Sequence, residues 1–339
     1  MGAVRTTGRT NAGPMARLFA LLAVTALLVS GCVRVHGENS VVPATTPQEA
    51  AEALARYAAI GNEANPVYDA ELNPEIDTGP LGEINQAGHR ARSAVHPEGN
   101  PRYRPLDFTD ARFAIPRQAG WPKFFLADAE SGREGDANRW LLVFTRNSIE
   151  EEWCASYLAV VPPEEVPELL VDGDGWAEAV PVAGEADRLS GAYAEFLARG
   201  SGSTDGAPDD ASGGGPIVFA EGRHTTGEVE RRAEEGTRPE FVVQYRDLKA
   251  EAAAHAPVGL RTVDGGALVF FTSHHHEKKT WAEGETPVVD EYVEALMEGT
   301  AERSVTSERL SIQAAAVPVE GGPVRVLARI AMTVGAKGG

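Results

Sequence analysis

The chain has 339 residues, with 31 Lys and Arg against 50 Asp and Glu, and a formal net charge of −19. So acidic a chain is a poor partner for nucleic acid, whose phosphates are bound by lysine and arginine. It also disfavours attachment to anionic lipid headgroups by charge alone. With 42 % hydrophobic residues the chain can bury a sizeable core, and its length predicts two domains.

The N-terminus has the three-part layout of a secretory signal. Arg5, Arg9 and Arg17 precede an apolar segment from Leu18 to Val29, and small residues then lead to Cys32. The apolar run is about twelve residues long, whereas a spanning helix needs about 20. An uncleaved anchor or an ordinary secreted protein remain the alternatives.

Residues 28–32 read Leu-Val-Ser-Gly-Cys and resemble the lipobox of bacterial lipoproteins. The resemblance implies a signal peptide over 1–31 and a diacylglycerol on the thiol of Cys32, which starts the mature chain whether translation begins at Met1 or at Met15. Two acyl chains suffice for stable anchoring. The implied location is the outer face of the cytoplasmic membrane, with residues 32–46 as a flexible tether.

A first α+β module is predicted over 47–163. Thr46 is an N-cap candidate, Pro47 suits the first helical turn, and Glu49 completes a capping box. Gly61 is expected to end this helix. The helix has one apolar face, formed by Ala50, Leu54, Tyr57 and Ala58. Strands are then expected over 103–115, 121–127, 140–145 and 153–161.

The same order repeats after a linker over 164–182, and predicts a second module over 183–335. Helices are expected over 183–199, 227–235 and 288–298, around a loop rich in Ser, Gly and Asp over 200–215. Strands are expected over 240–245, 258–263, 267–271, 280–282, 309–319 and 324–334. The turn Asp264-Gly265-Gly266 is a strong hairpin signal.

Helices followed by a curved antiparallel sheet resemble the nuclear-transport-factor-like or cystatin-like architecture, and this resemblance rests on element order alone. The whole mature chain also resembles the lipoproteins of unknown function found in Streptomyces-type actinobacteria. Besides the lipobox, the residues that carry this second resemblance are Pro47, the pair Arg56-Tyr57 and the hairpin over 264–270. It implies no established activity.

The most conspicuous polar cluster is Ser273-His274-His275-His276-Glu277. Imidazoles are good ligands for zinc, copper and nickel. Where the run leaves a strand, His274 and His276 share a face, and with Glu277 they form a candidate metal site. A closed structural zinc site needs four ligands, so an exposed polar turn is the alternative.

Other chemical signals are weak. Residues 171–176 resemble a calcium loop, but Trp176 and Ala177 occupy positions that the EF-hand pattern reserves for a ligand and a glycine, which favours a tight turn. Cys154 is expected to be a structural residue of a strand rather than a nucleophile. The sequence has no nucleophile elbow and no phosphate-binding loop, and no cofactor is predicted.

The sequence therefore favours a non-catalytic binding or scaffold lipoprotein of the cell envelope, with an envelope protein or a small ligand as partner. An envelope enzyme with an unrecognised site in one sheet, and a transporter-associated solute-binding lipoprotein, are the alternatives. A ligand would occupy the concave side of a sheet. Eight aromatic residues on the predicted strands line such a face or fill the core: Phe113, Trp121, Phe124, Trp140, Trp153, Tyr157, Phe270 and Phe271.

Overall fold

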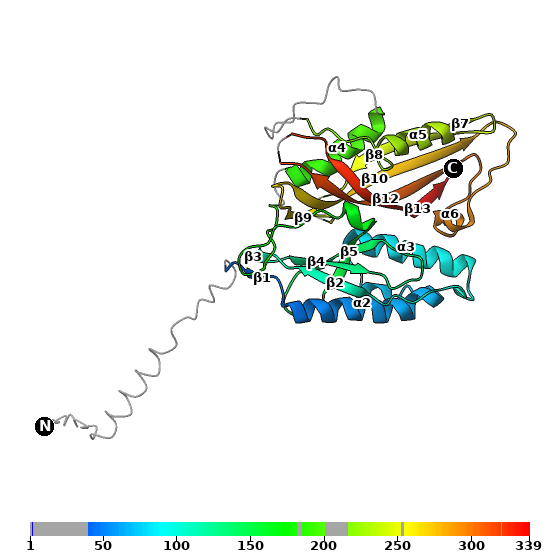
Figure 1. Cartoon of the computed structure of the whole chain (residues 1–339). Helices are drawn as coiled ribbons and strands as arrows, with labels where there is room; N and C mark the ends of the chain where they lie inside the picture. The colour runs from blue at the N-terminus through cyan, green and yellow to red at the C-terminus, as the bar shows by residue number, and fades with distance from the viewer. Residues whose placement is uncertain (1, 3–39, 182–184, 201–215, 252–253, 320) are drawn as a thin grey trace. The chain divides into compact units, whose positions relative to one another are not determined.

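The computed structural model describes residues 2, 40–181, 185–200, 216–251, 254–319 and 321–339 (Figure 1). Every helix and strand named below belongs to one unit, which runs from Val41 to Gly339. The predicted signal peptide, Cys32 and nearly all of the tether lie outside the described residues.

The N-terminal helices are α2 (Pro47–Val67), the short 3₁₀ helix η2 (Asn73–Glu75) and α3 (Gly79–Val95). The Thr46 hydroxyl accepts a hydrogen bond from the Glu49 amide at 3.1 Å, which confirms the predicted N-cap. The predicted end at Gly61 is wrong, because α2 continues to Val67. A glycine inside a helix costs only about 1 kcal/mol relative to alanine, less than the packing of the buried face contributes.

Four antiparallel strands form a small sheet in the order β2-β4-β5-β6. They are β2 (Thr109–Ala114), β4 (Lys123–Glu130), β5 (Arg139–Arg146) and β6 (Cys154–Val161). Two further short strands pair with each other, β1 (Val42–Pro43) and β3 (Arg117–Gln118). A 3₁₀ helix, η3 (Pro163–Glu165), follows β6. Strands β4, β5 and β6 fall close to the predicted ranges, whereas the strand predicted from residue 103 begins only at Thr109, as β2.

The C-terminal part contains the helices α4 (Glu185–Arg199), α5 (Thr226–Glu235) and α6 (Glu291–Ala295). A seven-stranded sheet has the order β11-β13-β12-β10-β8-β7, and β9 pairs with β10. The strands are β7 (Thr237–Arg238), β8 (Phe241–Lys249), β9 (Val258–Arg261), β10 (Ala267–Trp281), β11 (Met297–Glu298), β12 (Ser304–Val317) and β13 (Arg325–Gly338). Only the pairing of β11 with β13 is parallel among the described strand pairs, so the fold is α+β.

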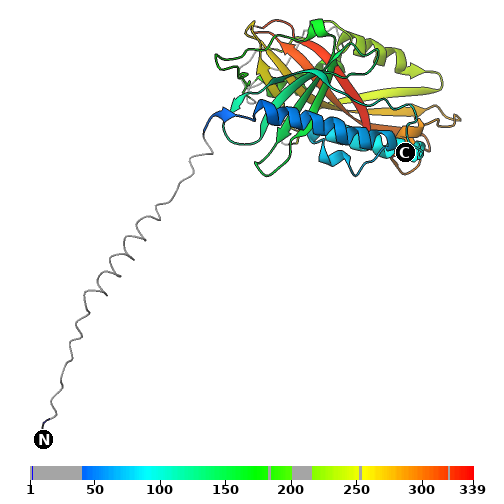
Figure 2. The same ribbon diagram turned by 60° about the horizontal axis from the view of Figure 1, so that its bottom comes forward.

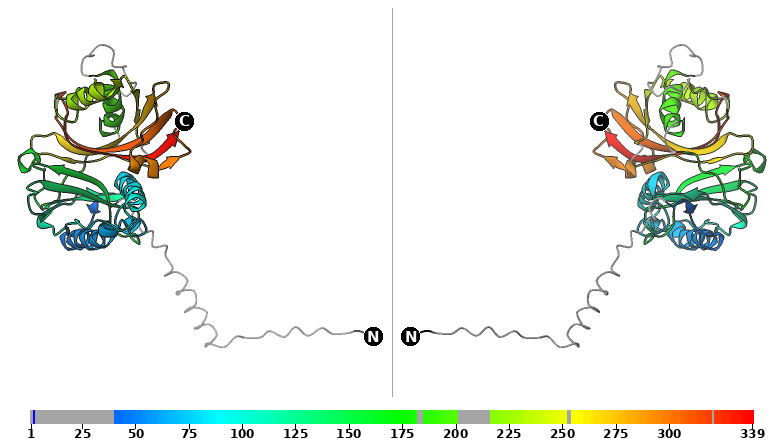
Figure 3. Two further views of the ribbon diagram at one scale, coloured as in Figure 1. Left: turned by 90° about the vertical axis from the view of Figure 1, so that its right-hand side faces the viewer. Right: turned by 90° about the vertical axis from the view of Figure 1, so that its left-hand side faces the viewer.

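The two sheets face each other and share one hydrophobic core. Tyr157 on β6 and Phe270 on β10 meet across this core with ring centroids 6.1 Å apart. Helix α2 lies across the opposite face of the small sheet (Figure 2), where Tyr57 contacts Phe144 edge-on at 5.9 Å. Helices α4 and α5 lie on the concave face of the large sheet (Figure 3). Helix α3 packs against β6, β12, β13 and α6.

Helix α5 buries charged side chains instead of apolar ones. Glu228 and Arg232 are both 6 % exposed, and Arg232 donates to both carboxylate oxygens of Asp247 on β8, at 3.0 and 2.9 Å. Glu228 accepts from Arg231 at 2.8 Å and from Arg232 at 3.0 Å, and lies 3.5 Å from Arg329 of β13. We call these five residues the α5 cluster. In it every arginine lies beside a carboxylate.

Candidate functional site: an arginine-lined cavity

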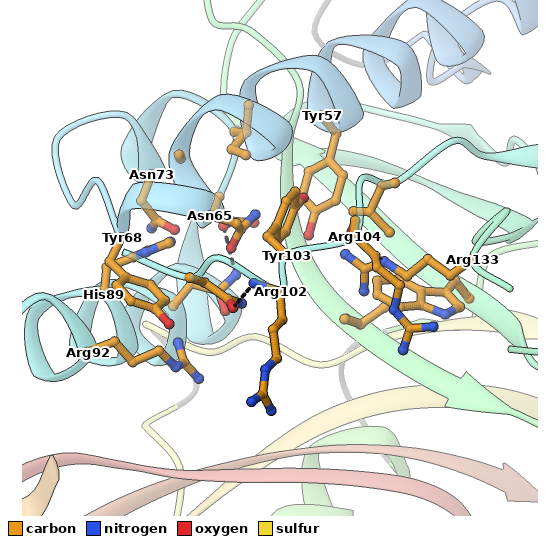
Figure 4. A pocket seen from close by; sticks show the side chains of 18 residues that line it. Tyr57, Asn65, Tyr68, Asn73, His89, Arg92, Arg102, Tyr103, Arg104 and Arg133 are labelled. Carbon is orange, nitrogen blue, oxygen red and sulfur yellow. Dashed lines mark hydrogen bonds between the residues drawn. The ribbon is translucent and has the colours of Figure 1, made fainter. Parts of the chain in front are cut away.

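A cavity of about 430 Å³ lies where the C-terminal end of α2 meets η2, α3 and strands β5 and β6 (Figure 4). Four arginines line it, Arg92, Arg102, Arg104 and Arg133. Asp77 is the only carboxylate among its described lining residues. In a chain with a net charge of −19, four arginines against one carboxyl group make this lining locally positive. We call it the arginine cavity.

Helix α2 fixes the loop that carries Arg102 and Arg104. The Asn62 side chain donates to the Leu106 carbonyl at 2.9 Å and accepts from the Leu106 amide at 2.8 Å. Its oxygen also accepts from the Tyr103 hydroxyl at 2.7 Å. These bonds hold the loop against α2, and they place Tyr103 at the cavity wall with Arg102 and Arg104 (Figure 4).

The same loop docks onto the end of α2 through Gly99. Its φ is +82°, and a Cβ atom there would lie 2.4 Å from the Pro66 carbonyl oxygen, so only glycine fits without rearrangement. Tyr68 ends the helix in the left-handed conformation, with φ of 56°, and its amide donates to the Ala64 carbonyl. Tyr68 also lines the cavity. Gly99 therefore fixes the start of the loop against the end of α2, and Tyr68 brings the cap of that helix to the same cavity.

The four arginines differ in how they are held. Arg133 lies over the rings of Tyr103 and Trp140, at 5.7 and 5.5 Å, and donates to the Arg104 carbonyl at 3.0 Å. Arg104 donates to the Glu134 carbonyl at 3.1 Å. The guanidinium groups of Arg92 and Arg102 have no hydrogen bond and no ion pair within the described residues. The cavity thus offers two guanidinium groups that no carboxylate of the described residues pairs with.

Two buried ionisable groups, Asp77 and His89, complete the wall. Burial raises the pKa of Asp77 to about 7, against the hydrogen bond from Asn85 at 2.8 Å, which lowers it. The second oxygen of Asp77, Oδ1, is buried with no hydrogen-bond partner, and so is Nδ1 of His89. Burial, and then the charge of Arg92, lower the pKa of His89. Burial therefore favours the protonated form of the Asp77 carboxyl group and the neutral form of the His89 imidazole in this wall.

The predicted polar turn at 273–277 is wrong, because β10 continues through it to Trp281. In this strand His275 points to one face, and His274 and His276 point to the other. His275 is 2 % exposed and burial lowers its pKa to about 2. His274 lies 3.4 Å from His255, whose other ring nitrogen lies 2.8 Å from Glu83. Glu277 lies 3.5 Å from Arg309.

The described residues contain no group of three His, Cys, Asp or Glu side chains placed to hold a metal ion. Metal binding by His274, His276 and Glu277 stays a prediction. Calorimetric titration with zinc and copper tests it directly, because imidazole is a good ligand for both metals.

The remaining predicted features are structural. Asp172 accepts the amides of Asp174 and Trp176 at 2.9 Å each, which confirms a tight turn there. Cys154 begins β6 half-buried, and burial raises the pKa of its thiol, which disfavours the reactive thiolate. Of the eight aromatic residues singled out above, Trp140 lines the arginine cavity, while five lie in the core: Phe124, Trp153, Tyr157, Phe270 and Phe271.

No residue of the arginine cavity other than Trp140 and Tyr57 was singled out in the sequence. The available signal is the segment Pro101-Arg102-Tyr103-Arg104-Pro105, two arginines around a tyrosine in an acidic chain. Pro105 disfavours the helical conformation at Arg104, which marks the segment as a loop.

Comparison with known proteins shows which class of protein the chain resembles. The chain is 44 % identical over 321 residues to an uncharacterized lipoprotein of Streptomyces coelicolor, covering 93 % of this chain and 92 % of the relative. An uncharacterized lipoprotein of Streptomyces avermitilis is 43 % identical over 321 residues, 92 % of each chain. A second one from Streptomyces coelicolor is 25 % identical over 299 residues, 84 % of this chain and 80 % of the relative.

The chain belongs to the family of the domain of unknown function DUF8094, whose model matches residues 41–338. The resemblance to Streptomyces lipoproteins is thereby confirmed. No solved structure matches the chain. Among the described residues, none of the helices has both the length and the apolar character needed to cross a bilayer.

Proposed function

We propose that the protein is an envelope lipoprotein that binds a small anionic ligand in the arginine cavity without transforming it. The observation that carries this proposal is the pair Arg92 and Arg102, whose guanidinium groups face the cavity without a carboxylate partner among the described residues. Guanidinium groups bind carboxylate and phosphate through charge-assisted hydrogen bonds. A volume of about 430 Å³ is in the range of small-molecule sites.

Isothermal titration of residues 41–339 with inorganic phosphate and with citrate tests this proposal. Arg102→Ala is expected to weaken binding about tenfold or more, because a hydrogen bond to a charged group contributes about 1.5–3 kcal/mol. Arg112→Ala is the matched control: it removes an exposed arginine outside the cavity that already pairs with Asp110 at 2.7 Å. If neither anion binds the wild-type protein, the proposal is wrong.

The membrane attachment belongs to the same proposal. A diacylglycerol on Cys32 would hold the chain at the outer face of the cytoplasmic membrane, with residues 32–46 as a tether. The names of the Streptomyces relatives support this location. Cys32→Ser is expected to release the protein from the membrane fraction. Crosslinking in cells, with the wild-type protein and with Cys32→Ser, would show whether an envelope protein associates only with the lipidated form.

An envelope enzyme is the second candidate, and Asp77 with His89 is the observation that favours it. A carboxyl group with a pKa of about 7 and a neutral imidazole in one cavity are suited to general acid–base catalysis. Hydrolysis of phosphate or carboxylate esters by the wild-type protein, lost in Asp77→Asn, would support the enzyme. Binding without turnover would support the first proposal.

We further propose that the chain consists of two modules of one plan, 47–163 and 183–335, joined by 164–182. The order of elements supports it, since α2 and α3 precede the small sheet, and α4 and α5 precede the large one. A nuclear-transport-factor-like or cystatin-like relationship rests on the same order. Because both sheets contribute to one hydrophobic core, we expect the modules to unfold in a single transition.

A further inference from the structure

A second cavity, of about 630 Å³, adjoins the arginine cavity at Arg92, which lines both. It lies between α3, α6 and strands β10, β12 and β13. At 100° per residue, Asn85, His89 and Arg92 fall on one side of α3 and line the arginine cavity. Gly88 and Ala91 fall on the neighbouring side and line the second cavity. Arg92 therefore stands at the boundary between the two spaces.

The carboxylates of the second cavity are already engaged. Glu277 lies 3.5 Å from Arg309, and Asp290 caps α6 by accepting from the Tyr292 and Val293 amides, at 3.0 and 3.3 Å. The Tyr292 hydroxyl lies 2.9 Å from His96 Nε2. The apolar part of the wall, which a ligand could contact, is formed by Ala91, Val293, Leu296 and Met332. The nearest uncommitted charge is the positive one of Arg92.

Gly88 lets Arg92 occupy this boundary. A Cβ atom on Gly88 would lie 2.7 Å from the Arg92 Nη1 atom, so any other residue would displace the guanidinium group. Helix α3 thus combines small residues beside the second cavity with a cation between the two cavities. A ligand bound to Arg92 from the arginine cavity has apolar wall immediately beyond it.

We infer that the ligand is an amphiphilic anion, whose phosphate or carboxylate group binds in the arginine cavity and whose apolar part extends past Arg92 into the second cavity. This inference rests on the proposed anion-binding function and names the ligand class. The head group meets Arg92 and Arg102. The alkyl chain of the ligand lies along Val293, Leu296 and Met332. An alkyl phosphate or a lipid with a single acyl chain has this chemistry.

Titration of residues 41–339 with inorganic, ethyl, butyl, hexyl and octyl phosphate tests the inference. The affinity is expected to rise about two- to fourfold for each added methylene until the second cavity is filled, the upper figure being that of full burial. An affinity that does not change with chain length would overturn the inference and leave the proposed function standing. If inorganic phosphate and all the alkyl phosphates fail to bind, the proposed function fails as well.

Variants of the second cavity test where the alkyl chain of the ligand binds. Leu296→Asp is expected to abolish the dependence on chain length while ethyl phosphate binds within twofold of wild type. Val293→Thr, which is nearly isosteric, should weaken the dependence and provides the test if Leu296→Asp unfolds the protein. Glu294→Gln, an exposed position of α6 outside the cavity lining, is the control. A dependence on chain length that survives both cavity variants would overturn the inference.

Phosphatidylcholine vesicles with and without lysophosphatidic acid distinguish the source of the ligand. Transfer of lysophosphatidic acid from vesicle to protein supports the inference and identifies a lipid headgroup. Binding of octyl phosphate without such transfer also supports it, and identifies a soluble amphiphile.

Discussion

The arginine cavity and the α5 cluster both contain several arginines in an acidic chain, but they differ in whether carboxylates pair with these arginines. In the α5 cluster Arg231 and Arg232 pair with Glu228, and Arg232 also pairs with Asp247. The side chains of Glu228, Arg232 and Asp247 are buried, whereas that of Arg231 is 42 % exposed. In the arginine cavity Arg92 and Arg102 have no carboxylate partner within the described residues. Arginines that stabilise the fold are matched by its own acids, whereas unmatched arginines at a cavity are available to a ligand.

The largest expected effect comes from breaking the α5 cluster. Glu228→Gln leaves Arg232 and Arg329 buried without this carboxylate, and should lower the free energy of unfolding by about 3–5 kcal/mol. Urea denaturation of residues 41–339 measures it. Glu230→Gln, on the exposed side of α5, is the control and should change stability by less than about 0.5 kcal/mol. Equal effects of the two variants would contradict the account of the cluster.

Ionised Asp77 should destabilise the fold, whereas ionised Glu228 stabilises it. Its folded pKa of about 7 lies above the usual value of 3.8, so the folded state holds a proton that the unfolded chain releases. Stability should therefore fall as pH rises from about 4 to about 7, and stay low above that. Asp77→Asn removes this dependence and should stabilise the protein at pH 8 by about 2–4 kcal/mol, measured by urea denaturation at several pH values. A variant less stable than wild type at pH 8 would refute the assignment.

The pH dependence of Glu228 separates the two regions further. Burial alone would raise the pKa of Glu228, but the hydrogen bond from Arg231 and the charges of Arg329 and Arg232 outweigh it and lower the pKa to about 2. The stabilisation is present above the usual glutamate pKa of 4.5 and lost as pH falls toward 2, by about 2–3 kcal/mol. Denaturation of Glu228→Gln between pH 5 and 2 should lack this loss. A loss of the same size in the variant would show that other carboxylates cause it.

The smallest effect on stability is expected from the arginine cavity itself. Arg102 is exposed and its guanidinium has no hydrogen bond to the described residues, so Arg102→Ala should change the free energy of unfolding by less than about 0.5 kcal/mol. Phosphate affinity should nevertheless fall about tenfold. Thermal unfolding with and without phosphate measures both quantities in one experiment. A large loss of stability without ligand would assign Arg102 to the fold.

Local patterns in the sequence predicted much of the fold. Capping at Thr46 and period-two alternation located α2 and the strands of the small sheet, because these signals depend on neighbouring residues. The prediction was wrong where tertiary packing outweighs local preference. Gly61 lies inside α2, and His275 continues β10 because Tyr245 and the α5 cluster cover it.

The arginine cavity was not predictable in the same way. Its arginines come from a helix, a loop and a hairpin, between positions 92 and 133, and no spacing rule connects them. Asp77 has no sequence signal that reveals its burial. The lipobox, by contrast, needs only five consecutive residues and was sufficient to predict the lipoprotein class.

A crystal structure of residues 41–339 grown with selenate tests the central claim most directly, because anomalous scattering from selenium locates the anion. We predict an anion bound between Arg92 and Arg102 in the arginine cavity of the wild-type protein, and its absence in Arg102→Ala. Selenate only on surface arginines or beside the α5 cluster, with the arginine cavity empty of it, would contradict the account.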